Sequence, residues 1–178
     1  MKKQWNVTDL LRNTRHDWLN TIQLIKGNIE LNRLDRVEEI IEKVIQQTRN
    51  EAKLSNLCIP ALTEELLTFN WNNHSFALET EVIGDQADLS TYQEELTNWT
   101  KAFLVHLDKY CSWTVDNHLL VTMQLLEEKR VIFDFHGQLR NISVLQEWIN
   151  TNGGIMETTK LIEYEISETE VYVVIQLM

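Results

Sequence analysis

The first third of the chain carries apolar residues at the spacing of a bundle helix. They recur at intervals of seven, four, three and four positions, which brings them to one face of an α-helix. These residues are Leu11, Trp18, Ile22, Ile25 and Ile29. Thr8 or Asp9 is suited to cap the start of this helix, so the pattern predicts a first helix that runs to about Asn32.

A second helix is expected after a short turn at Asn32–Asp35. Asp35, with Glu38 three residues later, resembles the start of a capping box. The helix is expected to end near Leu57, because Pro60 restricts the backbone of the residue before it. The four-three-four spacing of the first helix continues at Val37, Ile41, Val44 and Thr48. The two segments therefore predict an antiparallel helical hairpin, which we take as a domain of residues 1–58.

A hairpin of two helices leaves broad apolar faces without cover. Such faces are buried when four helices pack around one core. The simplest source of two more helices is a second copy of the same hairpin, related to the first by a two-fold axis. The sequence therefore predicts a homodimer held together by a four-helix bundle.

The pattern changes beyond Pro60. Segments that alternate apolar and polar residues, as strands do, now lie between amphipathic helices. Helices are expected over residues 61–73, 89–111 and 141–150, and strands over residues 76–83, 118–126, 131–135, 161–166 and 171–177. Asn152-Gly153-Gly154 is expected to end the last helix. Residues 59–178 therefore predict an α/β sandwich, and the whole chain an α+β fold.

The chain of 178 residues has a formal net charge of −11, which argues against nucleic acid as a partner. Residues 1–36 hold seven basic and four acidic side chains, whereas the remainder holds nine basic and 23 acidic ones. This asymmetry fits either ordinary solvated faces or a first helix that meets an acidic or phosphorylated partner.

Three further features bear on the cellular compartment. No run of about 18 apolar residues occurs, so no membrane span is expected. The basic start is followed by no apolar segment, so no signal peptide is expected. Cys58 and Cys111 are far apart and form no CxxC pair, which is typical of a reduced protein. We therefore expect a cytoplasmic protein.

His16 is the residue of the first helix that is best suited to chemistry. At about 100° per residue it points about 140° away from the apolar face. Arg12, Asn20, Gln23 and Gly27 lie one or more turns away on the side of His16. A neutral imidazole has a lone pair that can attack phosphorus, and cations and amides nearby suit phosphate oxygens. The alternative is a solvated surface histidine without a function.

The segment around His16 resembles the RHDxxNxLxxIxG phosphoacceptor box of dimeric histidine phosphotransfer modules. It reads Arg15-His16-Asp17-Trp18-Leu19-Asn20-Thr21-Ile22-Gln23-Leu24-Ile25-Lys26-Gly27. Together with LDRV, KLSNL and LTFNW further along, it resembles the sporulation initiation phosphotransferase B family. The resemblance covers most of the chain and is strongest over residues 12–72.

The resemblance implies both a fold and an activity. The expected fold is a hairpin that dimerises into a four-helix bundle, followed by a domain shaped like the ATP-binding domain of histidine kinases. The family moves a phosphoryl group from the aspartate of one response regulator to its own histidine, and then to the aspartate of a second regulator. By match to the box, His16 is the phosphorylated residue. Residues one and two turns away share its helix face, so we expect a docking patch of Arg12, Arg15, Asn20, Gln23 and Gly27 around it.

A fragment of a citrate-type sensor histidine kinase is the main alternative, because such kinases share the same box. That function requires ATP-binding residues. Lys109 stands where a metal-binding Asn is expected, and Asp134-Phe135-His136-Gly137 is the only trace of a glycine turn. No glycine-rich lid follows, although glycines are what allow backbone N–H groups to approach phosphates. The sequence therefore predicts that ATP is not bound.

Neither a metal nor another cofactor is expected in this chain. The remaining histidines have no metal-ligand spacing, and Mg²⁺ is expected to come from the acidic pocket of the response regulator. Asp17 could orient the imidazole of His16 or remove its proton, although an adjacent helical residue points elsewhere. A dimerisation scaffold without catalytic activity is the remaining alternative.

Overall fold

The computed structural model describes residues 6–152 and 157–178. The chain divides into two compact units, Met1–Thr48 and Arg49–Met178. This division lies inside the second helix, before the expected boundary at residue 58. The sequence predicts a helix break at Asn152-Gly153-Gly154. Asn152 is the last residue of a helix, and the two glycines lie outside the described residues.

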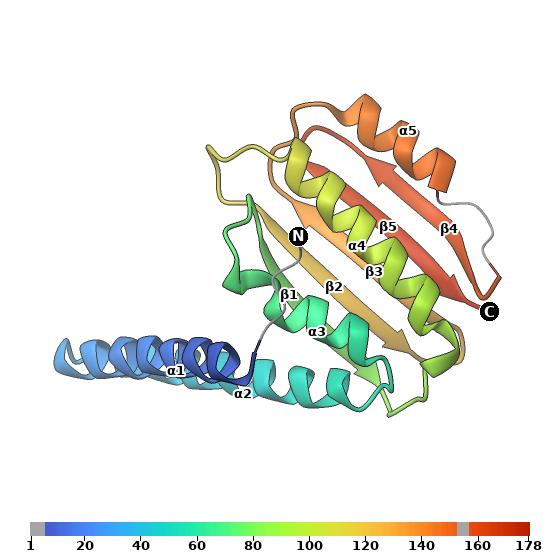
Figure 1. Ribbon diagram of the computed structural model, residues 1–178. Helices are drawn as coiled ribbons and strands as arrows, with labels where there is room; N and C mark the ends of the chain where they lie inside the picture. Colours follow the sequence, from blue (N-terminus) through green and yellow to red (C-terminus); the bar gives the residue numbers. More distant parts are fainter. Residues whose placement is uncertain (1–5, 153–156) are drawn as a thin grey trace. The chain divides into compact units, whose positions relative to one another are not determined.

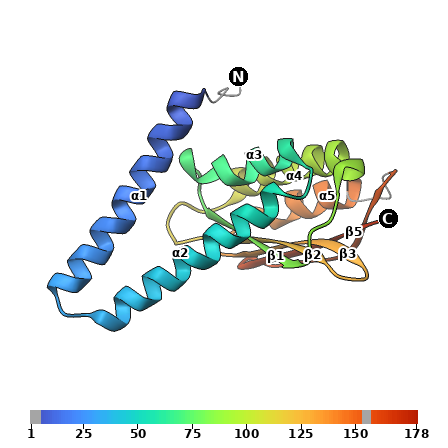
Figure 2. The same cartoon turned by 90° about the horizontal axis from the view of Figure 1, so that it is seen from below.

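The N-terminal unit contains the predicted helical hairpin. Helix α1 spans Val7–Glu30 and helix α2 spans Leu34–Ser55. The cap of α1 is Asn6 rather than Thr8 or Asp9, because the Asn6 side chain accepts a hydrogen bond from the backbone N–H of Asp9. Between the helices, Asn32 adopts a left-handed conformation with φ 53°, which Asn tolerates better than most residues. The two helices overlap in the view of Figure 1, whereas Figure 2 shows them diverging from this turn.

The apolar face of α1 stays largely open in the single chain. None of its residues is buried, and Ile25 is half-buried. The other four predicted seam residues are 51–57% exposed: Leu11, Trp18, Ile22 and Ile29. On α2, Val37 is buried, whereas Ile41 is 43% exposed. The two helices of a single chain therefore leave most of the predicted apolar face unburied.

The C-terminal unit is a five-stranded sheet with helices on one side (Figures 1 and 2). The helices are α3 (Pro60–Thr68), α4 (Gln93–Tyr110) and α5 (Ile142–Asn152), with short 3₁₀ turns at Phe69–Trp71 and Ser90–Tyr92. The strands are β1 (Ala77–Gly84), β2 (His118–Leu125), β3 (Lys129–His136), β4 (Thr159–Ile166) and β5 (Glu170–Leu177). The α+β class predicted from the sequence is therefore confirmed.

The strand order is β1-β2-β3-β5-β4, in which only β1 and β2 run parallel. Alternate residues of the central strands face the helices and form the core. Those of β3 are Val131, Phe133 and Phe135, each with 0% exposure. The long α4 packs across the sheet with Phe103 and Leu107, also at 0% exposure. Burial of this alternating set holds the sheet in register.

Several element boundaries differ from the sequence-based expectation. The third helix, expected over 89–111, is a 3₁₀ turn followed by α4 from Gln93 to Tyr110. The helix expected over 61–73 ends at Thr68 and continues as a 3₁₀ turn. Strand β3 extends beyond the predicted 131–135 at both ends, because it pairs with β2 along its whole length. Pairing with a neighbour, rather than the local pattern, sets these limits.

Candidate functional site

His16 lies in the middle of α1, on the side of the helix away from the apolar seam. Its side chain is 72% exposed. The spacing of Leu11, Trp18 and Ile22 assigns the seam to the opposite side of the helix, and the structure leaves the His16 side chain open to solvent. The imidazole is therefore accessible to another molecule.

Asn20 and Asp17 are the two predicted neighbours that the structure brings to His16. The side-chain amide of Asn20 lies 3.1 Å from Nδ1 of His16, one helical turn away. A carboxylate oxygen of Asp17 lies 3.7 Å from the same nitrogen. The adjacent residue Asp17 therefore does reach the ring, and both polar groups meet Nδ1 rather than Nε2. Such contacts determine which imidazole nitrogen carries the proton.

Arg12 is exposed one turn before His16, but its partner in the structure is Asp9. The guanidinium lies 3.2 Å from a carboxylate oxygen of Asp9, at i,i+3 spacing. Asp9 in turn accepts a hydrogen bond from the side-chain amide of Asn6. Our sequence-based search for site residues did not include Asp9 or Asn6, although the i,i+3 spacing of Asp9 and Arg12 is a visible signal of their pairing.

The remaining predicted patch residues differ in their direction on α1. Gln23 and Gly27 lie two and three turns beyond His16, within about 20° of its direction. Arg15 immediately precedes His16 and so lies about 100° around the helix. Nothing lies within 4 Å of the position that a Cβ would take at Gly27. The chain itself therefore does not require glycine there, and the open surface at Gly27 is available to another molecule.

Aromatic side chains pack between α4, α5 and the sheet in the C-terminal unit. Trp99 and Trp148 have ring centroids 5.6 Å apart, and Phe103 lies 5.2 Å from Phe133. The ring of His106 stacks on Trp148 at 4.6 Å. These rings join α5 to the middle of α4.

The single glycine of the Asp134–Gly137 trace has a structural role. A Cβ at Gly137 would lie 2.2 Å from the side-chain oxygen of Asn117. Asn117 is buried, and its amide donates to the backbone carbonyls of Ser75 and Ser112 at 2.7 and 2.6 Å. Its side-chain oxygen accepts the backbone N–H of Gln138 at 2.8 Å. Gly137 therefore makes room for an amide that joins three segments, and its presence needs no phosphate to explain it.

Asp108 forms a second polar network at the C-terminal end of α4. Its carboxylate accepts hydrogen bonds from the backbone N–H and hydroxyl of Ser75 at 2.7 and 2.6 Å, and lies 2.9 Å from Nδ1 of His74. Partial burial opposes ionisation, but the hydrogen bonds from His74 and Ser75 outweigh it, so the pKa of Asp108 lies below its ordinary value. The neighbouring Lys109 lies 5.2 Å from the ring centroid of Tyr110.

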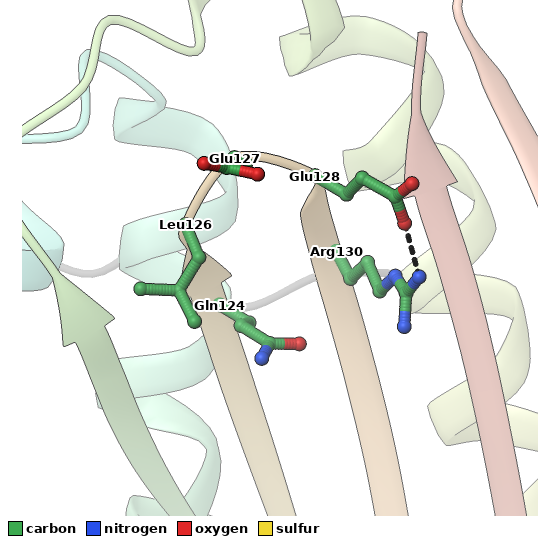
Figure 3. Close-up of a pocket in the computed structure, with 5 residues that line it drawn as sticks. All are labelled: Gln124, Leu126, Glu127, Glu128 and Arg130. Atoms are coloured by element: carbon green, nitrogen blue, oxygen red, sulfur yellow. Dashed lines mark hydrogen bonds and ion pairs between the residues drawn. The ribbon is translucent and has the colours of Figure 1, made fainter.

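A shallow hollow lies beside the β2–β3 turn, where Figure 3 shows Glu128 paired with Arg130. Its polar groups come from the turn and from the adjoining ends of β2 and β3, and they do not converge on a common point. Within residues 6–152 and 157–178, no group of three or more His, Cys, Asp or Glu side chains is arranged to hold a metal ion. Among the helices described, none is long and apolar enough to cross a membrane.

Comparisons with solved structures return histidine kinase domains. The catalytic domain of the histidine kinase ThkA has a TM-score of 0.40 and 12% sequence identity, over 70% of this chain and 91% of that one. The kinase domain of a blue-light activated histidine kinase from Erythrobacter litoralis has a TM-score of 0.38 and 12% identity. That match covers 57% of this chain and 51% of the other, so this chain spans about half its length.

Sequence comparisons cover both units of the chain. Residues 1–57 match the model described as Sensor kinase SpoOB-type, alpha-helical domain. Residues 58–178 match the model described as Sporulation initiation phospho-transferase B, C-terminal. The sporulation initiation phosphotransferase B of Bacillus subtilis is 39% identical over 171 residues, which cover 94% of this chain and 88% of that protein. The chain therefore belongs to the sporulation initiation phosphotransferase B family.

Proposed function

We propose that His16 is the phosphoryl carrier of this protein, accepting the group from the aspartate of one response regulator and passing it to the aspartate of a second. The phosphotransferase role in the sporulation phosphorelay follows from membership of the family. The observation that carries the assignment to His16 is its exposure of 72% together with the amide of Asn20 at Nδ1. The imidazole is both accessible and oriented.

The proposed reaction is an in-line displacement at phosphorus. A ring nitrogen of His16 attacks the aspartyl phosphate, the N–P bond forms as the bond from phosphorus to the carboxylate oxygen breaks, and the free aspartate carboxylate leaves. The second transfer is the same reaction in reverse on another receiver domain. Because acyl phosphates and phosphoimidazoles are both reactive, catalysis consists mainly of positioning and charge neutralisation.

We assign the attack to Nε2 of His16. The atom of Asn20 that lies 3.1 Å from Nδ1 is the amide nitrogen, but the flipped amide has the same shape. In the flipped orientation its oxygen accepts the Nδ1 proton, and the lone pair of the neutral ring is on Nε2. The carboxylate of Asp17, 3.7 Å from Nδ1, would balance the positive charge that develops on the ring. Arg12 and Arg15 supply cations for the phosphoryl oxygens.

We propose that the protein acts as a homodimer. Four of the five seam residues of α1 remain more than half exposed in the single chain, from Trp18 at 51% to Leu11 at 57%. A second hairpin packed on this face would form a four-helix bundle and leave His16 on its outer surface. The docking patch of the receiver domain would then be Arg12, Arg15, Asn20, Gln23 and Gly27 around His16.

We propose that the chain neither binds ATP nor holds a metal of its own, and that Mg²⁺ enters with the response regulator. Two observations support this. The sequence has no glycine-rich lid, and Gly137 is explained by its packing on Asn117. We place the protein in the cytoplasm, because Cys58 and Cys111 are both free thiols.

Transfer from a labelled receiver domain tests the assignment. A response regulator carrying a radioactive aspartyl phosphate is mixed with the protein, and label on the protein is followed in acid and in base. The expected label is acid-labile and base-stable, as for phosphohistidine. His16→Gln should take up none while keeping the helix content and dimer of the wild type.

The outcome separates the three functions considered for this chain. Label on the His16→Gln variant would contradict the assignment to His16. If the wild type takes up no label, the dimerisation scaffold without catalytic activity is the remaining function. Label taken directly from γ-labelled ATP, without a regulator present, would favour the sensor kinase.

A further inference from the structure

The last turns of α2 are built into the core of the C-terminal unit. This unit begins at Arg49, whereas α2 continues to Ser55. Leu54 and Leu57 are both 0% exposed and belong to the core that α4 and the sheet also form. Each fully buried leucine stabilises the folded unit by about 1.5–3 kcal/mol relative to an exposed position. These two leucines therefore hold this segment firmly in the core.

Two side chains of α2 also bind the edge of the sheet. Strand β1 is at one edge, so alternate backbone groups along it have no strand partner. The side-chain oxygen of Asn50 accepts the N–H of Val82 at 3.4 Å, and Nζ of Lys53 donates to the carbonyl of the same residue at 3.1 Å. Asn70 pairs with Leu78 in the same manner. Asn50 and Lys53 thus take the place of a neighbouring strand at Val82.

The carbonyl groups at and just after the end of α2 find partners from distant parts of the unit. A helix leaves its last carbonyls without partners in the helix itself. Here the carbonyl of Leu54 accepts from the hydroxyl of Thr63 at 3.4 Å. The carbonyl of Asn56 accepts from the side chain of Gln86 at 3.3 Å, and that of Leu57 accepts the N–H of Leu89 at 2.9 Å. The end of α2 is therefore held by backbone and side chains together.

The local sequence gives this part of α2 mixed support. Thr48, Asn50 and Ser55 have modest helix propensity, whereas the other residues of 49–54 are good helix formers. Helix formation is cooperative, so loss of the last turns weakens the residues before them. Since α2 is one helix from Leu34 to Ser55, its anchored end is covalently continuous with the helix that completes the hairpin.

We propose that the C-terminal unit serves as an anchor for α2, and that the contacts of Asn50, Lys53 and Leu54 within this unit keep residues 34–48 of the phosphotransfer hairpin helical. This gives a kinase-like fold a role that requires no nucleotide. The proposal does not depend on which residue carries the phosphoryl group, so a failure of the His16 assignment would leave it standing.

Hydrogen exchange of the full chain, followed by mass spectrometry at one protein concentration, tests the anchor. The Asn50→Ala, Lys53→Met double variant removes both hydrogen bonds to Val82 and leaves the buried leucines in place. Amides of residues 34–48 should exchange at least about fivefold faster than in the wild type. Arg49→Met removes a cation at an exposed neighbouring position and should exchange as the wild type does.

The result can overturn the proposal in two ways. If only residues 49–57 exchange faster, the anchor is local and does not reach the hairpin. If exchange is unchanged throughout α2, the bonds to Val82 do not anchor it at all. Circular dichroism checks that the double variant is folded. If the double variant is not folded, Lys53→Met alone is measured. Amides of residues 34–48 should then exchange about threefold faster than in the wild type. Exchange at the wild-type rate would contradict the proposal.

Discussion

His16, the proposed phosphoryl carrier, has few polar neighbours. The amide of Asn20 and the carboxylate of Asp17 both approach Nδ1, while Arg12 is drawn to Asp9. A phosphoryl group arriving at His16 would compete with Asp9 for the guanidinium. The proposed site is therefore a single exposed histidine on a helix, and under this proposal most of the charge needed for transfer comes from the partner.

Gly27 tests whether a partner approaches α1 closely. Gly27→Leu should stabilise the helix by roughly 0.8 kcal/mol but slow phosphoryl transfer, because a large side chain would hold the docked receiver domain away. Gly27→Ala is the matched control, since its Cβ meets nothing within 4 Å in the chain. Transfer rates are measured together with helix content. A Gly27→Leu variant that transfers at the wild-type rate would show that the partner docks elsewhere.

Arg12 is expected to act through its charge. Arg12→Ala should slow transfer more at low salt than at high salt. At high salt, screening already weakens the attraction between Arg12 and an acidic pocket in the wild type. Arg33→Ala removes the same charge in the turn between the helices and should have the smaller effect. Rates are compared over a series of salt concentrations. An equal effect of Arg12→Ala at every salt concentration would argue against electrostatic docking.

At the scale of elements, the seam of α1 is the feature that predicts assembly. Ile25→Lys places a charge on this seam and should give monomers or unfolded chain, since each buried aliphatic side chain contributes about 1.5–3 kcal/mol. Gln46→Lys, on the side of α2 away from its apolar face, should remain dimeric. Sedimentation at micromolar concentration makes the distinction. A wild-type protein that is monomeric under these conditions would refute the bundle.

The network at the end of α4 should make stability depend on pH. The lowered pKa of Asp108 means that its contribution is present above the ordinary carboxyl pKa of about 3.9 and is lost as the pH falls through the lower value of the folded state. Asp108→Asn should cost on the order of 1.5–3 kcal/mol at pH 7.

Urea unfolding at several pH values checks this prediction. The curves of wild type and Asp108→Asn should converge as the pH falls below about 4. Asp116→Asn, at an exposed position in the next loop, is the control and should unfold as the wild type does at pH 7. A constant difference between wild type and Asp108→Asn at all pH values would mean that the charge of Asp108 does not stabilise the fold.

At the scale of the whole molecule, the sequence has no glycine-rich lid, and the glycine of the Asp134–Gly137 segment is required by its packing on Asn117. We therefore expect no specific heat when Mg-ATP is added to the protein in a calorimeter, and no label from γ-labelled ATP. Folding of the sample is verified by circular dichroism. A dissociation constant in the low micromolar range would revive the kinase function.

The sequence by itself determined the hairpin, the order of helices and strands, and the outward direction of His16. Each of these depends on a local period: Leu11, Trp18 and Ile22 recur at helical spacing, and β3 and β5 alternate in steps of two. Local periods involve residues a few positions apart, so a single chain displays them without its fold. The limits of elements were less well predicted, because pairing and capping by Asn6 decided them.

Only the tertiary structure decided the roles of Gly137, Asn50 and Lys53. Gly137 resembled the remnant of a nucleotide turn, but the nearby amide of Asn117, far away in the sequence, explains it. Asn50 and Lys53 belong to no motif in the sequence, and their bonds to Val82 of β1 exist only in the fold. Such roles arise from contacts between residues distant in sequence, and no local pattern encodes them, because each partner is ordinary until the fold brings the two together.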